Sequence, residues 1–464
     1  LLFLLSIVFL ACGEERNPNI VVVHFLNGPP NLHPTNTNNT YTSHVNALCY
    51  QQLMVTGGQN GKLIPELSDG QPEFSEDRLR QTFTVRADAK WPDGSPITAK
   101  DVLFSYKLMA CPLVESGQRA TGIDMVESFR IDPDNDRRCT VQFTDFDISN
   151  DLFGAMTHVM DPRVFDPENV LEGYSFAELL TADSVQMSEE KLVNWATFFN
   201  DPQWGLEIEK MQSGSGPYRV KSWMDQQQIV LVRNEKFWAK GVEDPARLFE
   251  QGPDQIIYKF VKDDKAVELQ IKQAEIDASY MMSTVTYEEL TKSEAVQQSF
   301  QLGVVPRNNY ALVALNNDSD GIDHPRLFTD KTVRRALAYA QPIDKLIDEI
   351  FPGVATRTAS PIPPFHPDYN PNIEFMPYDR ARAVQMLDEA GWKDTDGDRI
   401  RDKIVDGKRI PFKFTLGYPQ MEMHSSNWPK ALPKLGEISV WTSPSSPWIL
   451  PKSMKELRTR NMMR

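Results

Sequence analysis

The chain has 464 residues, of which 41% are hydrophobic and 24% are charged, so it has the composition of a globular protein long enough for more than one domain. Its formal net charge is −15 and it contains no long basic run. A nucleic-acid binder needs a basic face to neutralise phosphates, so that class of protein is excluded.

The chain opens on an almost wholly apolar run, Leu1–Ala11, that ends at Cys12. These eleven residues rise only about 16 Å as a helix, so residues 1–11 are predicted to be the hydrophobic region of a signal peptide. The stretch Val8–Cys12 resembles a bacterial lipobox, with Phe9 in place of the usual leucine. We expect Cys12 to be lipidated and to become the mature N-terminus. An ordinary signal peptide with a chance cysteine is the alternative.

The first predicted strand is Ile20–Leu26, a continuous apolar run of the kind found in buried strands of largely parallel sheets. It leads into a loop stiffened by prolines. Open α/β sheets bind ligands in loops at the carboxyl ends of such strands. The loop residues that we predict to contact a ligand are Asn27, Pro30, Asn31, Leu32 and His33.

A strand, a turn and a capped helix follow. Residues Leu79–Arg86 alternate in polarity, as in a half-exposed strand. The segment Trp91–Gly94 has proline, aspartate and glycine in the order that a tight turn prefers. Thr98 and Asp101 have the spacing of a capping box, and apolar residues recur at helical spacing as far as Ala110.

Strands and helices alternate through the middle of the chain. The predicted elements are strands at Tyr218–Trp223, Gln228–Arg233 and Ile256–Val261, a helix at Asp263–Gln273, a strand beginning at Ile276, and a strand at Tyr310–Asn316. Polar and aromatic residues stand at the entry of the last strand. For that reason Asn308 and Tyr310 are also predicted to contact a ligand.

Two helical stretches complete the periodic part of the chain. Asp330 can cap a helix that Pro342 interrupts and that resumes over Ile343–Phe351. Asp379 can open a further helix, which Gly391 ends. Strands that alternate with helices in this way predict an α/β fold.

Three cysteines follow the predicted lipidation site, at Cys49, Cys111 and Cys139. An odd number allows at most one internal disulfide. Cys111 and Cys139 could pair in an oxidising compartment, and three separate buried thiols are equally compatible with the sequence. Their spacing fits no zinc motif.

The acidic segment Asp394–Asp398, with Asp402 nearby, offers clustered carboxylates that could ligate calcium. It departs from the EF-hand pattern at Gly397, Arg399 and Val405, and we favour a polar turn. The sequence contains no zinc-protease, nucleotide-binding or nucleophile-elbow motif. We therefore expect binding rather than catalysis, with no metal and no cofactor.

One segment carries a specific resemblance. Trp91–Tyr106 is similar, nearly residue for residue, to the signature of the family 5 extracellular solute-binding proteins, which include oligopeptide-, dipeptide- and nickel-binding members. The other segments that match in the family's order are Asn31–Pro34, Gly214–Tyr218, Asn234–Trp238, Glu275–Asp277, Val333–Leu337, Ile343–Asp344, Gly353 and Leu387–Trp392. Ala274 stands where the family usually has glycine. The resemblance runs from about residue 20 to about residue 418.

The resemblance implies a two-lobe α/β clamp of the type II periplasmic-binding-protein kind, with an extra subdomain in lobe one. Lobe one would comprise residues 12–45 and 160–265, the inserted subdomain residues 46–159, and lobe two residues 266–464. The match is faint after Gln420, where the family normally continues, so lobe two is expected to be C-terminally truncated.

The function that the resemblance implies is that of a substrate-binding lipoprotein of an ABC transporter. It would capture peptides or similar small solutes between its lobes and deliver them to a membrane permease. It would act as a monomer in the periplasm or on the outer cell surface, held to the membrane by lipid on Cys12. A nickel chelate, heme or an oligosaccharide is the alternative ligand on the same fold. A sensor subunit and a secreted hydrolase are rival functions, although the hydrolase lacks a recognisable triad.

Overall fold

The computed structural model describes residues 17, 19–35, 39–57, 62–115, 122–147, 149–155, 157–184, 187–201, 213–242, 249, 251–280, 282–304, 310, 312–317, 327–350, 353, 355–362, 364, 369–398, 400–405 and 407–414. The predicted signal segment with Cys12, residue Asn308 and the chain beyond residue 414 lie outside the described residues.

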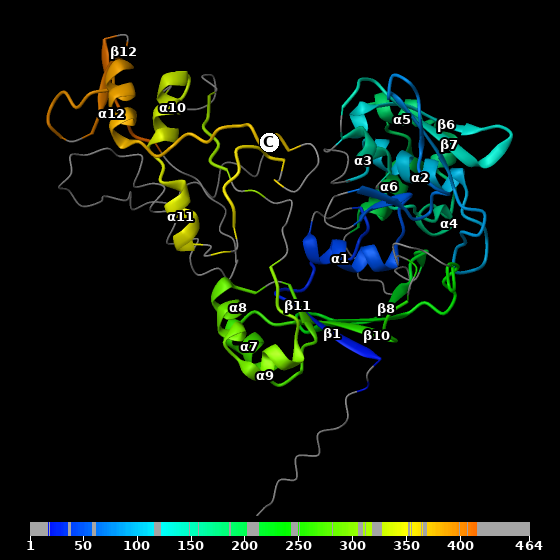
Figure 1. Ribbon diagram of the computed structural model, residues 1–464. Coiled ribbons are helices and arrows are strands. Elements are labelled where there is room, and N and C mark those ends of the chain that lie inside the picture. The colour runs from blue at the N-terminus through cyan, green and yellow to red at the C-terminus, as the bar shows by residue number, and fades with distance from the viewer. Residues whose placement is uncertain are drawn as a thin grey trace, which may run out of the picture. The chain divides into compact units, whose positions relative to one another are not determined.

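The chain forms two compact units, Leu1–Met282 (unit 1) and Ser283–Arg464 (unit 2). Helices and strands alternate along the chain (Figure 1), so the predicted α/β class is confirmed. The predicted lobe boundary near residue 266 and the predicted inserted subdomain, residues 46–159, stay predictions. The first of the proposed subdomain limits falls inside helix α1 (Thr40–Cys49).

The main sheet of unit 1 has five strands in the order β11-β1-β10-β9-β8. They are β1 (Ile20–Phe25), β8 (Tyr218–Met224), β9 (Gln228–Arg233), β10 (Gln255–Phe260) and β11 (Ala278–Ser279). The predicted parallel pairing is confirmed for β1, which is parallel to β10 on one side and to β11 on the other.

The prediction of a largely parallel sheet is wrong for the strands beyond β10. Strand β9 is antiparallel to β10 and to β8. Only residues 225–227 connect β8 to β9, and a connection this short joins antiparallel strands, whereas parallel strands need a long crossover. The sheet is therefore mixed.

Helix α1 lies along one face of this sheet (Figure 1) and packs on β8. The side chain of Asn39 caps it, because Asn39 Oδ1 accepts hydrogen bonds from the N–H groups of Tyr41 and Thr42. Val45 and Cys49 of α1 are buried in the same hydrophobic core as Phe25 of β1. Helix α1 and strand β1 thus share one hydrophobic core, which fixes the strand that precedes the predicted ligand loop.

Unit 1 also contains a four-stranded antiparallel sheet in the order β4-β5-β7-β6. Its strands and a separate two-stranded pair are β4 (Glu73–Phe74), β5 (Arg80–Thr84), β6 (Val126–Asp132), β7 (Asn135–Phe143), β2 (Met54–Gly57) and β3 (Lys62–Pro65). Helix α2 (Ala99–Ala110) packs on β6 and β7. Its predicted capping box is confirmed, with the Thr98 N–H donating to Asp101 Oδ2 over 2.7 Å.

Short helices fill the remainder of the described part of unit 1. They are the 3-10 helices η2 (Ile123–Met125) and η3 (Leu171–Gly173) and the α-helices α3 (Asn150–Ala155), α4 (Pro162–Phe165), α5 (Phe176–Thr181), α6 (Glu190–Asn200) and α7 (Asp264–Lys272). Among the described residues, no helix combines the length and the apolar character that a membrane span requires.

Ala274 follows α7 in a left-handed conformation, with a φ of 55°. The N–H of Ala274 donates to the carbonyl of Ile271, and the N–H of Glu275 donates to the carbonyl of Gln270. This is the arrangement of a helix end that favours glycine, because a Cβ clashes with the backbone in this conformation. Ala274 is therefore a non-glycine residue in a conformation that favours glycine.

We expect Ala274→Gly to raise the free energy of unfolding by about 1 kcal/mol, because glycine removes the Cβ strain of the left-handed conformation. Ala177→Gly, at an exposed position of α5, is a matched control that should lower it by about 1 kcal/mol through the loss of helix propensity. Urea denaturation of both variants measures the two effects. If both substitutions change the free energy of unfolding in the same direction, the left-handed conformation of Ala274 is not strained.

Unit 2 has its own hydrophobic core, which includes Val333, Leu337, Leu387 and Trp392. Its elements are α8 (Thr284–Thr291), α9 (Glu294–Ser299), α10 (Lys331–Tyr339), α11 (Ile343–Ile350), α12 (Arg380–Glu389), β12 (Asp402–Val405) and β13 (Lys408–Pro411). The predicted caps of α10 and α12 are confirmed.

The prediction of a strand at Tyr310–Asn316 is wrong for its described residues, which have no regular structure. Tyr310, Leu312 and Val313 are exposed. A strand requires a neighbour for its backbone N–H and C=O groups. The described strands of unit 2, β12 and β13, pair only with each other, so the apolar pattern finds no partner there.

Candidate functional site

The predicted ligand loop begins where β1 ends. Because β1, β10 and β11 are parallel, the loop lies at the edge of the sheet where all three strands finish. Of the predicted contact residues, Pro30 is exposed, Asn27 and Asn31 are half-buried, and Leu32 and His33 are buried. Of these predicted side chains, those of Asn27, Pro30 and Asn31 have surface available to a solute.

His33 holds the loop from inside. Its Nε2 lies 2.9 Å from the carbonyl of Phe199 at the end of α6, and its Nδ1 accepts a hydrogen bond from the N–H of Thr35. This pairing requires the neutral ring with the proton on Nε2. Burial lowers the pKa of His33 to about 4, although the hydrogen bond to Phe199 opposes the shift.

Asn31 shapes the turn that His33 anchors. Its Oδ1 accepts from the N–H of His33, and its carbonyl accepts from the hydroxyl of Thr42 in α1. The loop is thus tied to α1 on one side and to α6 on the other. That the loop contacts a ligand stays a prediction.

An aromatic cluster that sequence reasoning missed lies beside the loop. Its members are Phe25, Tyr41, His44, Tyr258, Phe260 and Tyr280. A Cβ on Gly28 of the loop would lie 2.8 Å from Phe260 Cε2, so the loop backbone rests on this ring. These residues come from four separate segments, and only the clustering of Tyr41 and His44 near the loop could have suggested the group from the sequence.

The glycine turn Gly214–Gly216 packs against the end of α1. The N–H of Gly216 donates to the carbonyl of Cys49 over 3.0 Å. A Cβ on Gly214 would lie 1.8 Å from the oxygen of that carbonyl. Glycine is therefore required here because two backbone segments touch, and the turn fixes α1 beside β8.

A buried polar network begins two residues after Cys49, at Gln51. Glu66 accepts hydrogen bonds from the N–H of Gln52 and the side-chain amide of Gln51, at 2.7 and 3.4 Å. Gln51 accepts in turn from the indole N–H of Trp238. Burial raises the pKa of Glu66 to about 7, and the two hydrogen bonds oppose that rise. The sequence did not indicate that Glu66 is buried, because it shows only a single glutamate after a short strand.

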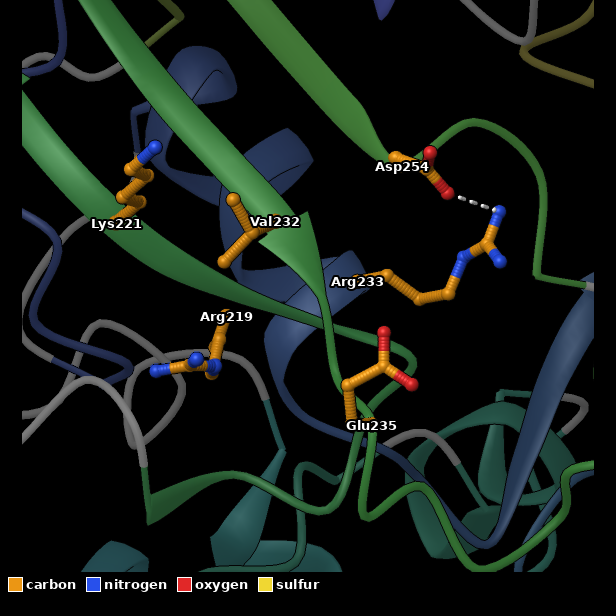
Figure 2. A pocket seen from close by; sticks show the side chains of 6 residues that line it. All are labelled: Arg219, Lys221, Val232, Arg233, Glu235 and Asp254. Atoms are coloured by element: carbon orange, nitrogen blue, oxygen red, sulfur yellow. Dashed lines mark ion pairs between the residues drawn. The ribbon is translucent and has the colours of Figure 1, made fainter. Parts of the chain in front are cut away.

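A charged groove of about 380 Å³ lies on the opposite end of the sheet (Figure 2). Its lining residues are Arg219, Lys221, Val232, Arg233, Glu235 and Asp254. Arg233 ends β9, Asp254 precedes β10, and their side chains pair at 2.9 Å. Strand β9 is antiparallel to β10, and β10 is parallel to β1. The end of β9 that carries Arg233 therefore lies at the opposite end of the sheet from the loop after β1.

The acidic segment of unit 2 forms hydrogen-bonded turns. Carboxylate oxygens of Asp394, Asp396 and Asp398 lie within 4.8 Å of one another, and all three residues are exposed. Asp394 accepts from the N–H of Gly397, and Asp396 pairs with Arg409. These contacts are those of the polar turn favoured from the sequence.

The three cysteines Cys49, Cys111 and Cys139 are buried and none is in a disulfide, so Cys111 and Cys139 are not paired with each other. Burial raises the pKa of Cys49 and of Cys139 to about 12, which keeps both thiols protonated and unreactive at neutral pH. Tyr310, the other predicted contact residue within the described part of the chain, is exposed on unit 2.

The signature segment is held by structural contacts. Trp91 is buried, and Asp93 accepts hydrogen bonds from the N–H and hydroxyl of Ser95 and pairs with Arg163. The bonds from Ser95, with a smaller contribution from Arg163, lower the pKa of Asp93 to about 2. The segment thus fixes the turn that leads into α2.

Comparison with solved structures identifies the fold. The oligopeptide-binding protein AppA from Bacillus subtilis, solved with a nonapeptide, matches with a TM-score of 0.59 and 20% identity over 91% of this chain and 73% of that one. NikZ from Campylobacter jejuni, solved with Ni(L-His), matches with a TM-score of 0.59 and 18% identity over 84% of this chain and 66% of that one. The predicted two-lobe binding-protein fold is confirmed by these matches.

Sequence comparison points the same way. The oligopeptide-binding protein AppA of Bacillus subtilis is 27% identical over 344 residues, which are 73% of this chain and 52% of the relative. The chain thus spans about half the length of the curated relatives it matches. The model of the bacterial extracellular solute-binding proteins, family 5 Middle, matches residues 62–448. The chain belongs to the family 5 bacterial extracellular solute-binding proteins.

Proposed function

We propose that this chain is the substrate-binding lipoprotein of an ATP-driven importer and that it captures peptides. The observation that carries the proposal is the loop at the carboxyl edge of β1, β10 and β11, in a member of a solute-binding family. Its half-buried Asn27 and Asn31 offer polar groups, and a peptide presents backbone N–H and C=O groups that such side chains can bind.

The anchoring of the loop supports the same function. Binding is tighter when the site is ordered before the ligand arrives, because less conformational entropy is lost. His33 and Asn31 tie the loop to α6 and α1 through contacts within the protein itself. The buried Leu32 and His33 thus order the loop, and Asn27, Pro30 and Asn31 would contact the ligand.

The wider assembly belongs to the same proposal. Lobe one would comprise residues 12–45 and 160–265 around the inserted subdomain 46–159, and lobe two would begin at residue 266. Lipid on Cys12 would hold the protein at the membrane, outside the cytoplasm, where an ABC permease receives the solute from the monomer. The alternative ligands are a nickel chelate, heme and an oligosaccharide.

Native mass spectrometry of the protein purified from its own cells tests the proposal. We expect a ladder of retained peptide masses. When those peptides are titrated back onto stripped protein, Asn27→Ala should weaken binding about tenfold, because it removes a hydrogen bond and leaves a buried peptide group unpaired. Asn19→Ala, exposed at the other end of β1, is the matched control. A retained nickel chelate, heme or oligosaccharide, or equal affinities for the two variants, would contradict the peptide site.

A further inference from the structure

The rings of the aromatic cluster extend from the core to the surface. Phe25 is fully buried and stacks on Tyr258, with centroids 4.2 Å apart. Tyr41 and Tyr280 contact Phe25 at centroid distances of 5.0 and 6.2 Å. His44 and Tyr280 lie 4.9 Å apart and are both exposed.

The exposed pair rests on fixed supports. His44 projects from α1, which packs on the sheet, and Tyr280 follows directly after β11. Their common neighbour Phe25 has no exposed surface. Rings held in this way lose little freedom when another ring packs on them, which is what a pre-ordered recognition surface requires.

The pair also lies at the edge of the sheet where the loop begins. Phe25 is the last residue of β1, and Tyr280 comes one residue after the end of β11, which is parallel to β1. The loop reaches the cluster through Gly28, which touches the Phe260 ring. A peptide that contacts Asn27 is therefore brought next to exposed aromatic rings.

We propose that His44 and Tyr280 form a subsite for an aromatic side chain of the bound peptide. The inference rests on the proposed function, because it assigns a side-chain preference to the same loop region. Aromatic rings pack edge to face or offset at centroid distances of about 4.5–7 Å. The tilt of 54° between His44 and Tyr280 leaves two ring surfaces at an angle, against which a third ring can pack in that way.

A cationic side chain fits this pair less well. Cations are attracted to the electron-rich faces of tryptophan, tyrosine and phenylalanine. Of this pair only Tyr280 belongs to that group, so a cation finds one such face. An aromatic ring can pack on both members of the pair.

Binding of a pentapeptide series by calorimetry tests the inference. In this series one phenylalanine or one leucine replaces each residue of pentaalanine in turn. At one position we expect phenylalanine to bind wild-type protein about fivefold more tightly than leucine, as an added aromatic contact would give. Tyr280→Leu and His44→Leu, which lie in different segments, should each remove that advantage. Tyr378→Leu, an exposed tyrosine of unit 2, should keep it.

The possible outcomes separate the inference from the function. If the series binds wild-type protein with no preference for phenylalanine, or if Tyr280→Leu and His44→Leu keep the preference, the subsite is wrong and peptide capture stands. If no peptide of the series binds wild-type protein, the proposed function and the subsite fall together. Circular dichroism of each variant shows whether the fold is intact, and a peptide carrying p-benzoylphenylalanine at the preferred position should crosslink to α1 or to the segment after β11 in the wild-type protein.

Discussion

Gly214→Ala is expected to lower the free energy of unfolding of unit 1 by about 3 kcal/mol. The new Cβ would lie 1.8 Å from the carbonyl oxygen of Cys49 and 2.7 Å from its carbon. Both are backbone atoms, so no side-chain rotation relieves the contact. The Cys49 carbonyl is also held by the N–H of Gly216, so the end of α1 must separate from the glycine turn.

Thermal unfolding followed by circular dichroism measures this effect, and we expect the Tm to fall by about 6 °C or more. Gly173→Ala is a matched control, because the same Cβ at Gly173 meets nothing within 4 Å. Gly216→Ala should act in the same direction as Gly214→Ala, since its Cβ would lie 2.5 Å from the carbonyl oxygen of Leu48. A variant at Gly214 as stable as the one at Gly173 would show that α1 and the turn can move apart without cost.

The parts of the fold that sequence predicted are those with local signals. The capping box at Thr98, the strand Ile20–Leu26 and the helix after Asp379 each carry their pattern within a few residues. Glycine positions are a weaker case. The segment Gly214–Tyr218 was noted for its resemblance to a family segment, and the contact that requires glycine joins it to Cys49, far away in the sequence.

Helix α1 could not be predicted from local pattern. Its sequence contains two threonines, a serine, an asparagine, a valine and a tyrosine, all of which have modest helix propensity. What stabilises it is tertiary packing, with Val45 and Cys49 in the core and Asn39 at the cap. A helix of this kind can be predicted only when the sheet on which it packs is known.

The candidate site shows the same limit. The position of the loop after β1 follows from a general rule for sheets, so Asn27 and Pro30 could be proposed from the sequence. The burial of Leu32 and His33 depends on their contacts with distant segments such as Phe199. The aromatic cluster unites rings from residue 25 to residue 280, and only the strand order β11-β1-β10 brings them together.

Glu66→Gln is expected to stabilise the protein at pH 8 and to destabilise it by about 1 kcal/mol at pH 4.5, where only the cost of the glutamine amide remains. Burial raises the pKa of Glu66 from its ordinary value of 4.5 to about 7, which corresponds to about 3 kcal/mol. Below pH 4.5 the carboxyl is protonated in both the folded and the unfolded chain, and the penalty is absent. Between pH 4.5 and 7 the unfolded chain ionises first, so stability falls as the pH rises, and above pH 7 the full penalty is present.

Glutamine removes the charge but also one acceptor oxygen, so part of the gain is offset. One amide oxygen can still accept from the N–H of Gln52, the shorter of the two hydrogen bonds at 2.7 Å. The weaker contact to Gln51, at 3.4 Å, is replaced by two facing amide groups, which costs about 1 kcal/mol. The net gain expected at pH 8 is therefore about 2 kcal/mol.

Urea denaturation of wild-type protein and Glu66→Gln at pH 4.5 and pH 8 measures the difference. Glu127→Gln, at an exposed position of β6, is the matched control for the loss of one carboxylate. If Glu66→Gln shifts stability equally at the two pH values, the carboxyl is not buried in the folded protein. If the gain appears only at pH 8, then Glu66 is retained at a cost in stability. The buried carboxylate would then lower stability while it holds Gln51 and Gln52 in place and, through Gln51, Trp238.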